Sequence, residues 1–161
     1  KNHEYLIKIF QELLEIKPDS VLVLVGEGEL RSSVEEQVHR MSLNGRVRFL
    51  GQRSDVASIY QALDVFVLPS LYEGLCLVGV EAQRNGLPCF FSDEITKEEK
   101  LTENVTFLPI SESPATWARR ISEARRAVSV DDMAFAKYDI YEAAKELEQI
   151  YDELLKNGMD R

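Results

Sequence analysis

The sequence predicts an α/β fold in which a doubly wound parallel sheet carries helices on both faces. Short apolar segments alternate with amphipathic ones along most of the 161 residues, which is typical of strands alternating with helices. The segment from Val21 to Val25 is continuously apolar, as expected for a parallel strand buried on both faces. Glycine or polar residues follow the apolar segments, at the strand ends where such folds bind their ligands.

The composition limits the class of protein. Hydrophobic residues make up 45% and charged residues 29%, which is ordinary for a globular domain. No apolar segment approaches the ~18 residues that span a bilayer. We therefore expect no direct membrane contact by this domain and a cytoplasmic location, or one at the inner face of the membrane in the full-length protein. The formal net charge of −9 disfavours a nucleic-acid partner.

The sequence gives no indication of a metal site. Cys76 and Cys89 are the only cysteines, and their spacing matches no zinc pattern. The chain contains no D-x-D motif, and Asp131-Asp132 is interpreted as the start of a helix. We therefore expect no metal ion and no cofactor.

The first part of the chain predicts a helix, a strand and a second helix. Apolar residues at helical spacing predict a helix over residues 2–16, and a strand follows over residues 20–25. Gly26 and Gly28 come directly after this strand, where glycine lets a ligand approach the backbone closely. A tight strand-to-helix turn is the alternative interpretation. The next helix, over about residues 28–42, is expected to face inward through Leu30, Val34, Val38 and Met41.

The remaining elements follow the same alternation. Strands are predicted over residues 46–50, 65–68, 87–91 and 105–108. Gly51 and Arg53 lie in a loop after the first of these, and Ser54-Asp55 is expected to cap a helix. Residues 97–101 are predicted to form a short exposed helix. Two further helices are predicted at the C-terminal end, over about residues 113–127 and 140–157.

The segment after the strand at 65–68 carries two glutamates. Glu73 lies in a loop, and Glu81 lies about two turns into the following helix, roughly 10 Å further along its axis. Gly74 and the residues after it offer free backbone N–H groups at the helix N-terminus, which is a natural phosphate site. One carboxylate could bind sugar hydroxyls and the other a ribose diol. Alternatively both are ordinary solvated glutamates, and spacing alone leaves this open.

This segment resembles a known family signature. Glu73-Gly74-Leu75-Cys76-Leu77, followed by Glu81-Ala82 and Gly86-Leu87-Pro88, resembles the E-x7-E motif of the group 1 retaining glycosyltransferases, which have the GT-B fold. Cys76 departs from the motif, since the family usually has glycine there. Lys1-Asn2, Val25–Gly28, Phe49–Gly51 and the last helix also resemble family segments, most closely those of capsular and exopolysaccharide enzymes.

The resemblance implies a role for each matching position. Glu73 would bind the donor sugar, and Lys1 would neutralise the leaving diphosphate; both would be catalytic. Glu81 would bind the ribose. The remaining donor-binding positions would be Gly74, Leu75, Cys76, Leu77, Gly26, Gly28, Gly51 and Arg53. The implied reaction is metal-independent transfer of a sugar, with retention, from a UDP- or GDP-linked donor, and the nucleotide sugar is a substrate rather than a cofactor.

The resemblance also implies a domain organisation. Residues 1–161 would form one donor-binding domain, and its first strand and an acceptor domain would lie upstream of Lys1. The acceptor, a sugar or a lipid-linked sugar, would bind through that other domain, so this chain alone would bind donor without catalysing transfer. The last helix would then expose apolar surface, which could support self-association.

Two alternative functions differ in class. The chain could be a stand-alone nucleotide-sugar-binding subunit that completes a transferase with a separate partner. Glu73 and Glu81 could instead be the acid and base of a glycoside hydrolase. Such carboxyl groups face each other about 5 to 9.5 Å apart across the sugar, which two glutamates on one loop and helix do not easily achieve.

Overall fold

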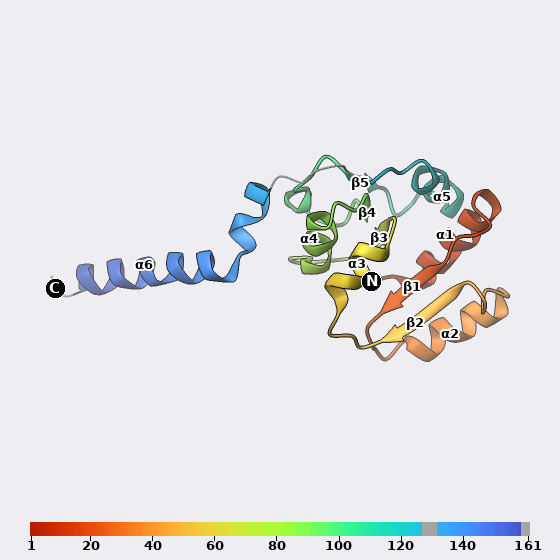
Figure 1. Cartoon of the computed structure of the whole chain (residues 1–161), viewed down its shortest axis with the longest axis horizontal. Helices are drawn as coiled ribbons and strands as arrows, with labels where there is room; N and C mark the ends of the chain where they lie inside the picture. The colour runs from red at the N-terminus through yellow and green to blue at the C-terminus, as the bar shows by residue number, and fades with distance from the viewer. Residues whose placement is uncertain (127–131, 159–161) are drawn as a thin grey trace. The chain divides into compact units, whose positions relative to one another are not determined.

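The computed structural model describes residues 1–126 and 132–158. It contains two compact units, Lys1–Val130 and Asp131–Arg161. The strands of the first unit are β1 Leu22–Val25, β2 Val47–Gly51, β3 Phe66–Leu68, β4 Cys89–Ser92 and β5 Val105–Leu108 (Figure 1). Its helices are α1 His3–Ile16, α2 Arg31–Arg40, α3 Val56–Ala62, α4 Leu77–Arg84, the 3-10 helix η1 Lys97–Glu99 and α5 Pro114–Ser122.

All strand pairs are parallel, as the sequence predicts. β1 pairs with β2, and β4 lies between β3 and β5. The strands therefore form a two-stranded and a three-stranded sheet rather than one continuous sheet. β1 and β3 each pair with a single described strand, so each keeps one unpaired edge.

Helices cover both faces of the three-stranded sheet, because successive residues of a strand point to opposite faces. On β4, Cys89 and Phe91 belong to the core cluster that includes Tyr60 of α3 and Ala82 of α4. Phe90, between them, belongs to another cluster, which includes Ile9 of α1, Trp117 of α5 and Leu108. The prediction of a doubly wound α/β fold is confirmed.

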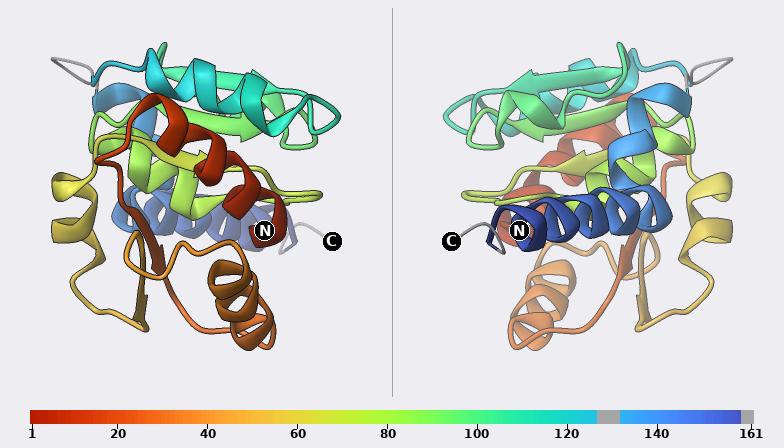
Figure 2. Two further views of the ribbon diagram at one scale, coloured as in Figure 1. Left: turned by 90° about the vertical axis from the view of Figure 1, so that its right-hand side faces the viewer. Right: turned by 90° about the vertical axis from the view of Figure 1, so that its left-hand side faces the viewer.

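Helix α1 joins the two sheets into one core. Ile7 and Phe10 pack in the cluster that contains Val34 and Val47, beside the two-stranded sheet. Ile9 packs instead with the three-stranded sheet and α5. The helices α1 and α5 lie side by side, as Figure 2 shows. The first helix of the chain therefore fixes the spacing between the sheets.

Two predictions about burial are wrong. Val21 and Val25 are 50% and 41% exposed, so the first strand is not buried on both faces; its alternate residues Leu22 and Leu24 pack inward instead. Leu30 is 70% exposed because α2 begins only at Arg31, after a turn in which the Arg31 amide bonds to the Gly28 carbonyl. Gln37 is buried on the inner face of α2 and donates to the Glu4 carbonyl.

The C-terminal helices lie where the sequence predicts them, but not all of their first and last residues are the predicted ones. Helix α5 begins after Ser113, whose hydroxyl accepts from the Thr116 amide, and ends at Ser122 rather than near 127, which lies outside the described residues. In the second unit, the 3-10 helix η2 spans Asp132–Tyr138 and α6 spans Ile140–Gly158. Asp131 lies outside the described residues.

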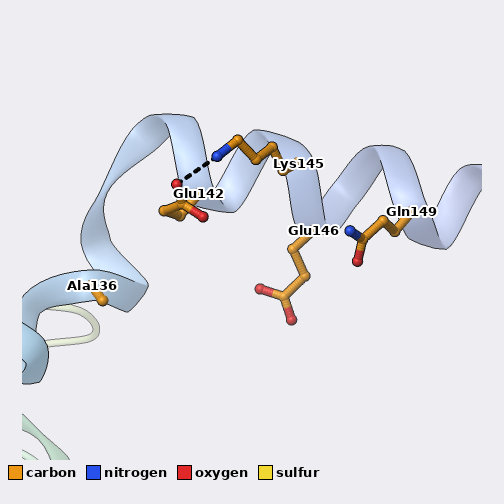
Figure 3. Close-up of a pocket in the computed structure, with 5 residues that line it drawn as sticks. All are labelled: Ala136, Glu142, Lys145, Glu146 and Gln149. Carbon is orange, nitrogen blue, oxygen red and sulfur yellow. Dashed lines mark hydrogen bonds and ion pairs between the residues drawn. The ribbon is translucent and has the colours of Figure 1, made fainter.

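Helix α6 is amphipathic and carries exposed apolar residues. They are Ile140, Tyr141, Leu147, Ile150, Tyr151, Leu154 and Leu155. A shallow hollow of this unit is lined by Ala136, Glu142, Lys145, Glu146 and Gln149 (Figure 3). Lys145 Nζ lies 2.7 Å from Glu142 Oε1, so the hollow is a charged, solvated surface. Within the described residues, no helix is both long and apolar enough to cross a bilayer.

Candidate functional site

The loop between β3 and α4 holds Glu73 in a fixed position. Its Oε1 atom accepts a hydrogen bond from the Ser70 hydroxyl at 2.7 Å and forms an ion pair with Lys1 Nζ at 2.8 Å. Ser70 is itself buried and its carbonyl accepts from the Ser92 hydroxyl, which ties the loop to the end of β4. The side chain of Glu73 is 14% exposed, so the carboxylate is mostly enclosed but open to solvent at one side.

The surroundings keep Glu73 ionised. Burial raises its pKa, but the hydrogen bonds from Lys1 and Ser70 and the positive charge of Lys1 outweigh this, and the pKa of Glu73 lies below its ordinary value. The ion pair therefore stabilises the fold at neutral pH, and this contribution is lost only as the pH falls into the acid range.

The bend from residue 74 to residue 77 is open at the surface. Leu75 and Leu77 are 61% and 55% exposed, and a Cβ added at Gly74 would meet no atom within 4 Å. Helix α4 begins at Leu77, so the first amides of the helix lie in this bend. The Cys76 amide is already bound within the chain, to the Glu99 carboxylate at 2.8 Å. The amides of Gly74, Leu75 and Leu77 have no partner among the described residues.

Cys76 fits the position where the family usually has glycine. Its φ is −91°, a value open to any residue, and its side chain is buried in the core rather than turned toward the bend. Gly79 provides the space for it, because a Cβ at Gly79 would lie 3.2 Å from Cys76 Sγ and 2.9 Å from Phe91 Cζ. Burial also raises the pKa of the Cys76 thiol, so the thiol stays protonated.

Replacing Gly79 by alanine is expected to destabilise the protein. Overpacking a core costs about 1–3 kcal/mol, and alanine recovers roughly 1 kcal/mol of helix propensity. We expect a net loss of ~1 kcal/mol in the free energy of unfolding, measured by urea denaturation. Gly45→Ala is the control, since a Cβ at Gly45 meets no atom within 4 Å. A Gly79→Ala protein as stable as the unchanged one would contradict this packing.

Glu81 lies on the same helix, exposed to solvent, and its orientation is set by Tyr60. The Tyr60 hydroxyl lies 3.1 Å from Glu81 Oε2 and 3.2 Å from the Val78 carbonyl oxygen. Burial and the charge of Glu81 raise the pKa of Tyr60 well above its ordinary value, so the hydroxyl keeps its proton and acts as a donor. Sequence reasoning missed the contact between Tyr60 and Glu81, although a tyrosine rather than a phenylalanine on the inner side of a helix is a signal for a polar role.

The glycine loops after β1 and β2 meet each other. The Gly26 amide donates to the Gly51 carbonyl at 2.8 Å, and both glycines have positive φ, +117° and +65°, which favours glycine. A Cβ at Gly26 or Gly28 would meet nothing within 4 Å. Arg53, in the loop after β2, donates to both carboxylate oxygens of Asp55, at 2.8 and 2.7 Å. Asp55 therefore precedes α3 as predicted, but its side chain does not cap the helix.

The structure thus joins the predicted residues in two groups. Lys1 and Glu73 are in direct contact, and Glu73 and Glu81 stand at either side of the open bend on the same loop and helix. Gly26 and Gly51 form the second group. Among the described residues, no three His, Cys, Asp or Glu side chains are grouped so as to hold a metal ion.

The sequence matches one family over most of its length. The family described as "Glycosyl transferases group 1" matches residues 1–126, which include both glutamates and the two glycine loops. The chain belongs to this family. The resemblance drawn from the two-glutamate segment is therefore confirmed at the level of the family.

Curated relatives are similar over part of their length. The chain is 43% identical over 130 residues to the putative glycosyltransferase EpsF of Bacillus subtilis, covering 79% of this chain and 33% of that protein. It is 44% identical over 96 residues to an Escherichia coli UDP-Gal:alpha-D-GlcNAc-diphosphoundecaprenol alpha-1,3-galactosyltransferase, covering 58% of this chain and 25% of that protein. The chain thus spans a third or less of the length of these relatives.

Solved structures of other proteins share the fold. Anabaena Alr3699/HepE in complex with UDP and glucose matches with a TM-score of 0.77 at 23% identity, over 94% of this chain and 45% of that one. The pneumococcal O-GlcNAc transferase GtfA, in complex with UDP and GlcNAc, matches with a TM-score of 0.70 at 20% identity, over all of this chain and 34% of that one. At these identities the likeness establishes the fold alone.

Proposed function

We propose that the chain binds the nucleotide-sugar donor of a retaining glycosyltransferase that acts in the synthesis of a surface polysaccharide or glycolipid. The observation that carries the proposal is the arrangement of the open bend: the Lys1–Glu73 ion pair at one side, unbonded amides in the middle and Glu81 on the following helix. UDP is favoured as the nucleotide because the E. coli relative is named for the donor UDP-Gal and because two solved structures of the same fold are complexes with UDP.

Each part of the arrangement suits one part of such a donor. The amides of Gly74, Leu75 and Leu77, at the N-terminus of α4, suit the diphosphate. Lys1 adds a positive charge beside them and would turn from Glu73 to the diphosphate when donor binds. Glu73 keeps its charge, and its carboxylate, which is partly exposed, would accept from sugar hydroxyls. Glu81, oriented by Tyr60, would accept from the ribose hydroxyls.

The reaction assigned to the whole protein needs little chemistry from side chains. The leaving diphosphate would take the proton of the attacking hydroxyl on the same face of the sugar, and the new bond would keep the configuration of the old one. Catalysis would then consist of positioning and of stabilising negative charge on the leaving group. We propose no metal and no cofactor. The acceptor would bind outside this chain, which alone would bind donor without transfer, and α6 is the surface proposed for self-association.

The proposal is tested by replacing Glu81 with alanine and measuring UDP and GDP binding by calorimetry. A carboxylate that accepts hydrogen bonds from a ribose contributes about 1.5–3 kcal/mol, so Glu81→Ala is expected to weaken UDP binding roughly tenfold or more. Glu36→Ala, on the exposed side of α2, is the control and should leave the affinity unchanged. Equal affinity in the Glu81 variant would refute its assigned role, and absence of binding by the unchanged protein would refute the proposed function.

A further inference from the structure

A buried glutamate lies behind the open bend. Glu99 ends the 3-10 helix η1 and is 1% exposed, whereas the sequence predicts that residues 97–101 form an exposed helix. Its Oε1 atom accepts the Cys76 amide at 2.8 Å. Its Oε2 atom is buried and has no hydrogen-bond partner in the described part of the chain. The Glu99 carboxyl group is thus buried with a single hydrogen bond, although burying such a group costs free energy of folding.

The backbone around Glu99 is anchored independently of its carboxylate. Gln83 of α4 is fully buried, and its Nε2 atom donates to the Glu99 carbonyl at 2.8 Å. Its Oε1 atom accepts the amides of Leu101 and Thr102 at 2.8 and 3.1 Å. Gln83 therefore attaches this segment to α4 by three hydrogen bonds to backbone groups. Removing the Glu99 side chain would leave those bonds intact, so what the carboxylate adds is its contact with Cys76.

That contact acts on the residues that we assign to the diphosphate. Cys76 stands between Leu75 and Leu77, and fixing the direction of its amide restricts the two peptide planes on either side. The accepting oxygen also lies at the N-terminal end of α4, where the first amides of the helix are found. The neighbouring amides of Gly74, Leu75 and Leu77 are left without partners. A bend whose amides already point in fixed directions binds an anion without first having to be ordered.

We propose that Glu99 is a positioning residue for donor binding: through the Cys76 amide it holds the bend in the conformation that receives the diphosphate. This inference rests on the proposed function. Glu99 itself is buried beneath the bend and does not touch the donor.

The test compares UDP affinity, by calorimetry, in Glu99→Ala, Glu99→Gln and the unchanged protein. Glu99→Ala frees the Cys76 amide and is expected to raise the Kd for UDP about tenfold, because the bend must then be ordered when the anion binds. Glu99→Gln keeps an oxygen that can accept the same amide, so it is expected to stay within about threefold of the unchanged protein. Rescue by glutamine separates positioning from a requirement for the charge.

Gln37→Ala is the matched control, because it also removes a buried polar side chain that bonds to a backbone group, Glu4 O, but lies on α2. It should bind UDP like the unchanged protein. Equal UDP affinity in Glu99→Ala, an equal loss in Glu99→Gln, or an equal loss in Gln37→Ala would each overturn the role of Glu99. If the unchanged protein binds neither UDP nor GDP, the proposed function fails, and the role of Glu99 fails with it. If the unchanged protein binds UDP, a negative result with the Glu99 variants overturns the role of Glu99 alone.

Discussion

Replacing Glu73 by glutamine is expected to lower the rate of sugar transfer by the natural protein about 100- to 1000-fold. The change keeps the size of the side chain but removes the charge that Lys1 and Ser70 hold in place. On the proposed function Glu73 contacts the reacting sugar and acts mainly in the transition state, and losing one such fixed group typically costs about 2.7–4 kcal/mol. The measurement is kcat with a UDP-linked sugar and the acceptor.

The same variant should bind UDP with nearly unchanged affinity. UDP lacks the sugar, and its contacts are assigned to Glu81 and to the amides of the bend rather than to Glu73. Glu94→Gln, an exposed acid in the loop after β4, serves as the control for a general loss of negative charge. A Glu73→Gln protein that retains more than a tenth of the kcat would show that this carboxylate does not act in the transfer step.

Replacing Trp117 by alanine is expected to lower the free energy of unfolding by about 3–5 kcal/mol, the usual cost of truncating a buried aromatic residue. Trp117 is fully buried on α5. Its ring packs edge-on against Tyr5 of α1, with 6.0 Å between ring centroids. Its Nε1 atom donates to the Pro109 carbonyl at 3.1 Å. The substitution would open a cavity where the first and the last helix of this unit meet.

Urea denaturation of the Trp117→Ala protein measures this loss. Because small domains are stable by only about 5–15 kcal/mol, the variant should unfold at a clearly lower urea concentration. Trp117→Phe retains most of the apolar volume and should lose less than half as much. A loss below ~2 kcal/mol for the alanine variant would mean that α1 and α5 do not depend on this contact.

The alternation of apolar segments was enough to predict the strands and their parallel pairing. The segment Val105–Leu108 was predicted with the bounds that the structure has, because turn residues flank it on both sides. Gly86 lies just past the end of α4 with a φ of +72°, a position and a conformation that favour glycine. The division into two sheets was not predicted, since a strand's own residues do not specify which strand lies beside it.

The candidate site was predictable only in part. The spacing of Glu73 and Glu81 placed them on one loop and helix, and the family resemblance added Lys1. The supporting contacts of Tyr60 and Glu99 were missed because they join residues 21 and 23 positions apart. For Glu99 the local pattern was misleading as well. Its neighbours Lys97, Glu98 and Lys100 are exposed and charged, and only the position of α4 shows that Glu99 points inward.

The unpaired edges of β1 and β3 affect how this chain behaves in solution. Each edge presents backbone N–H and C=O groups that no described strand satisfies, alongside apolar side chains such as Val23 and Val67. Such edges accept any extended segment of compatible side chains, whether it comes from the same polypeptide or from a different molecule. We therefore expect the 161-residue chain to aggregate as its concentration rises, and a peptide that occupies one of these edges to reduce this.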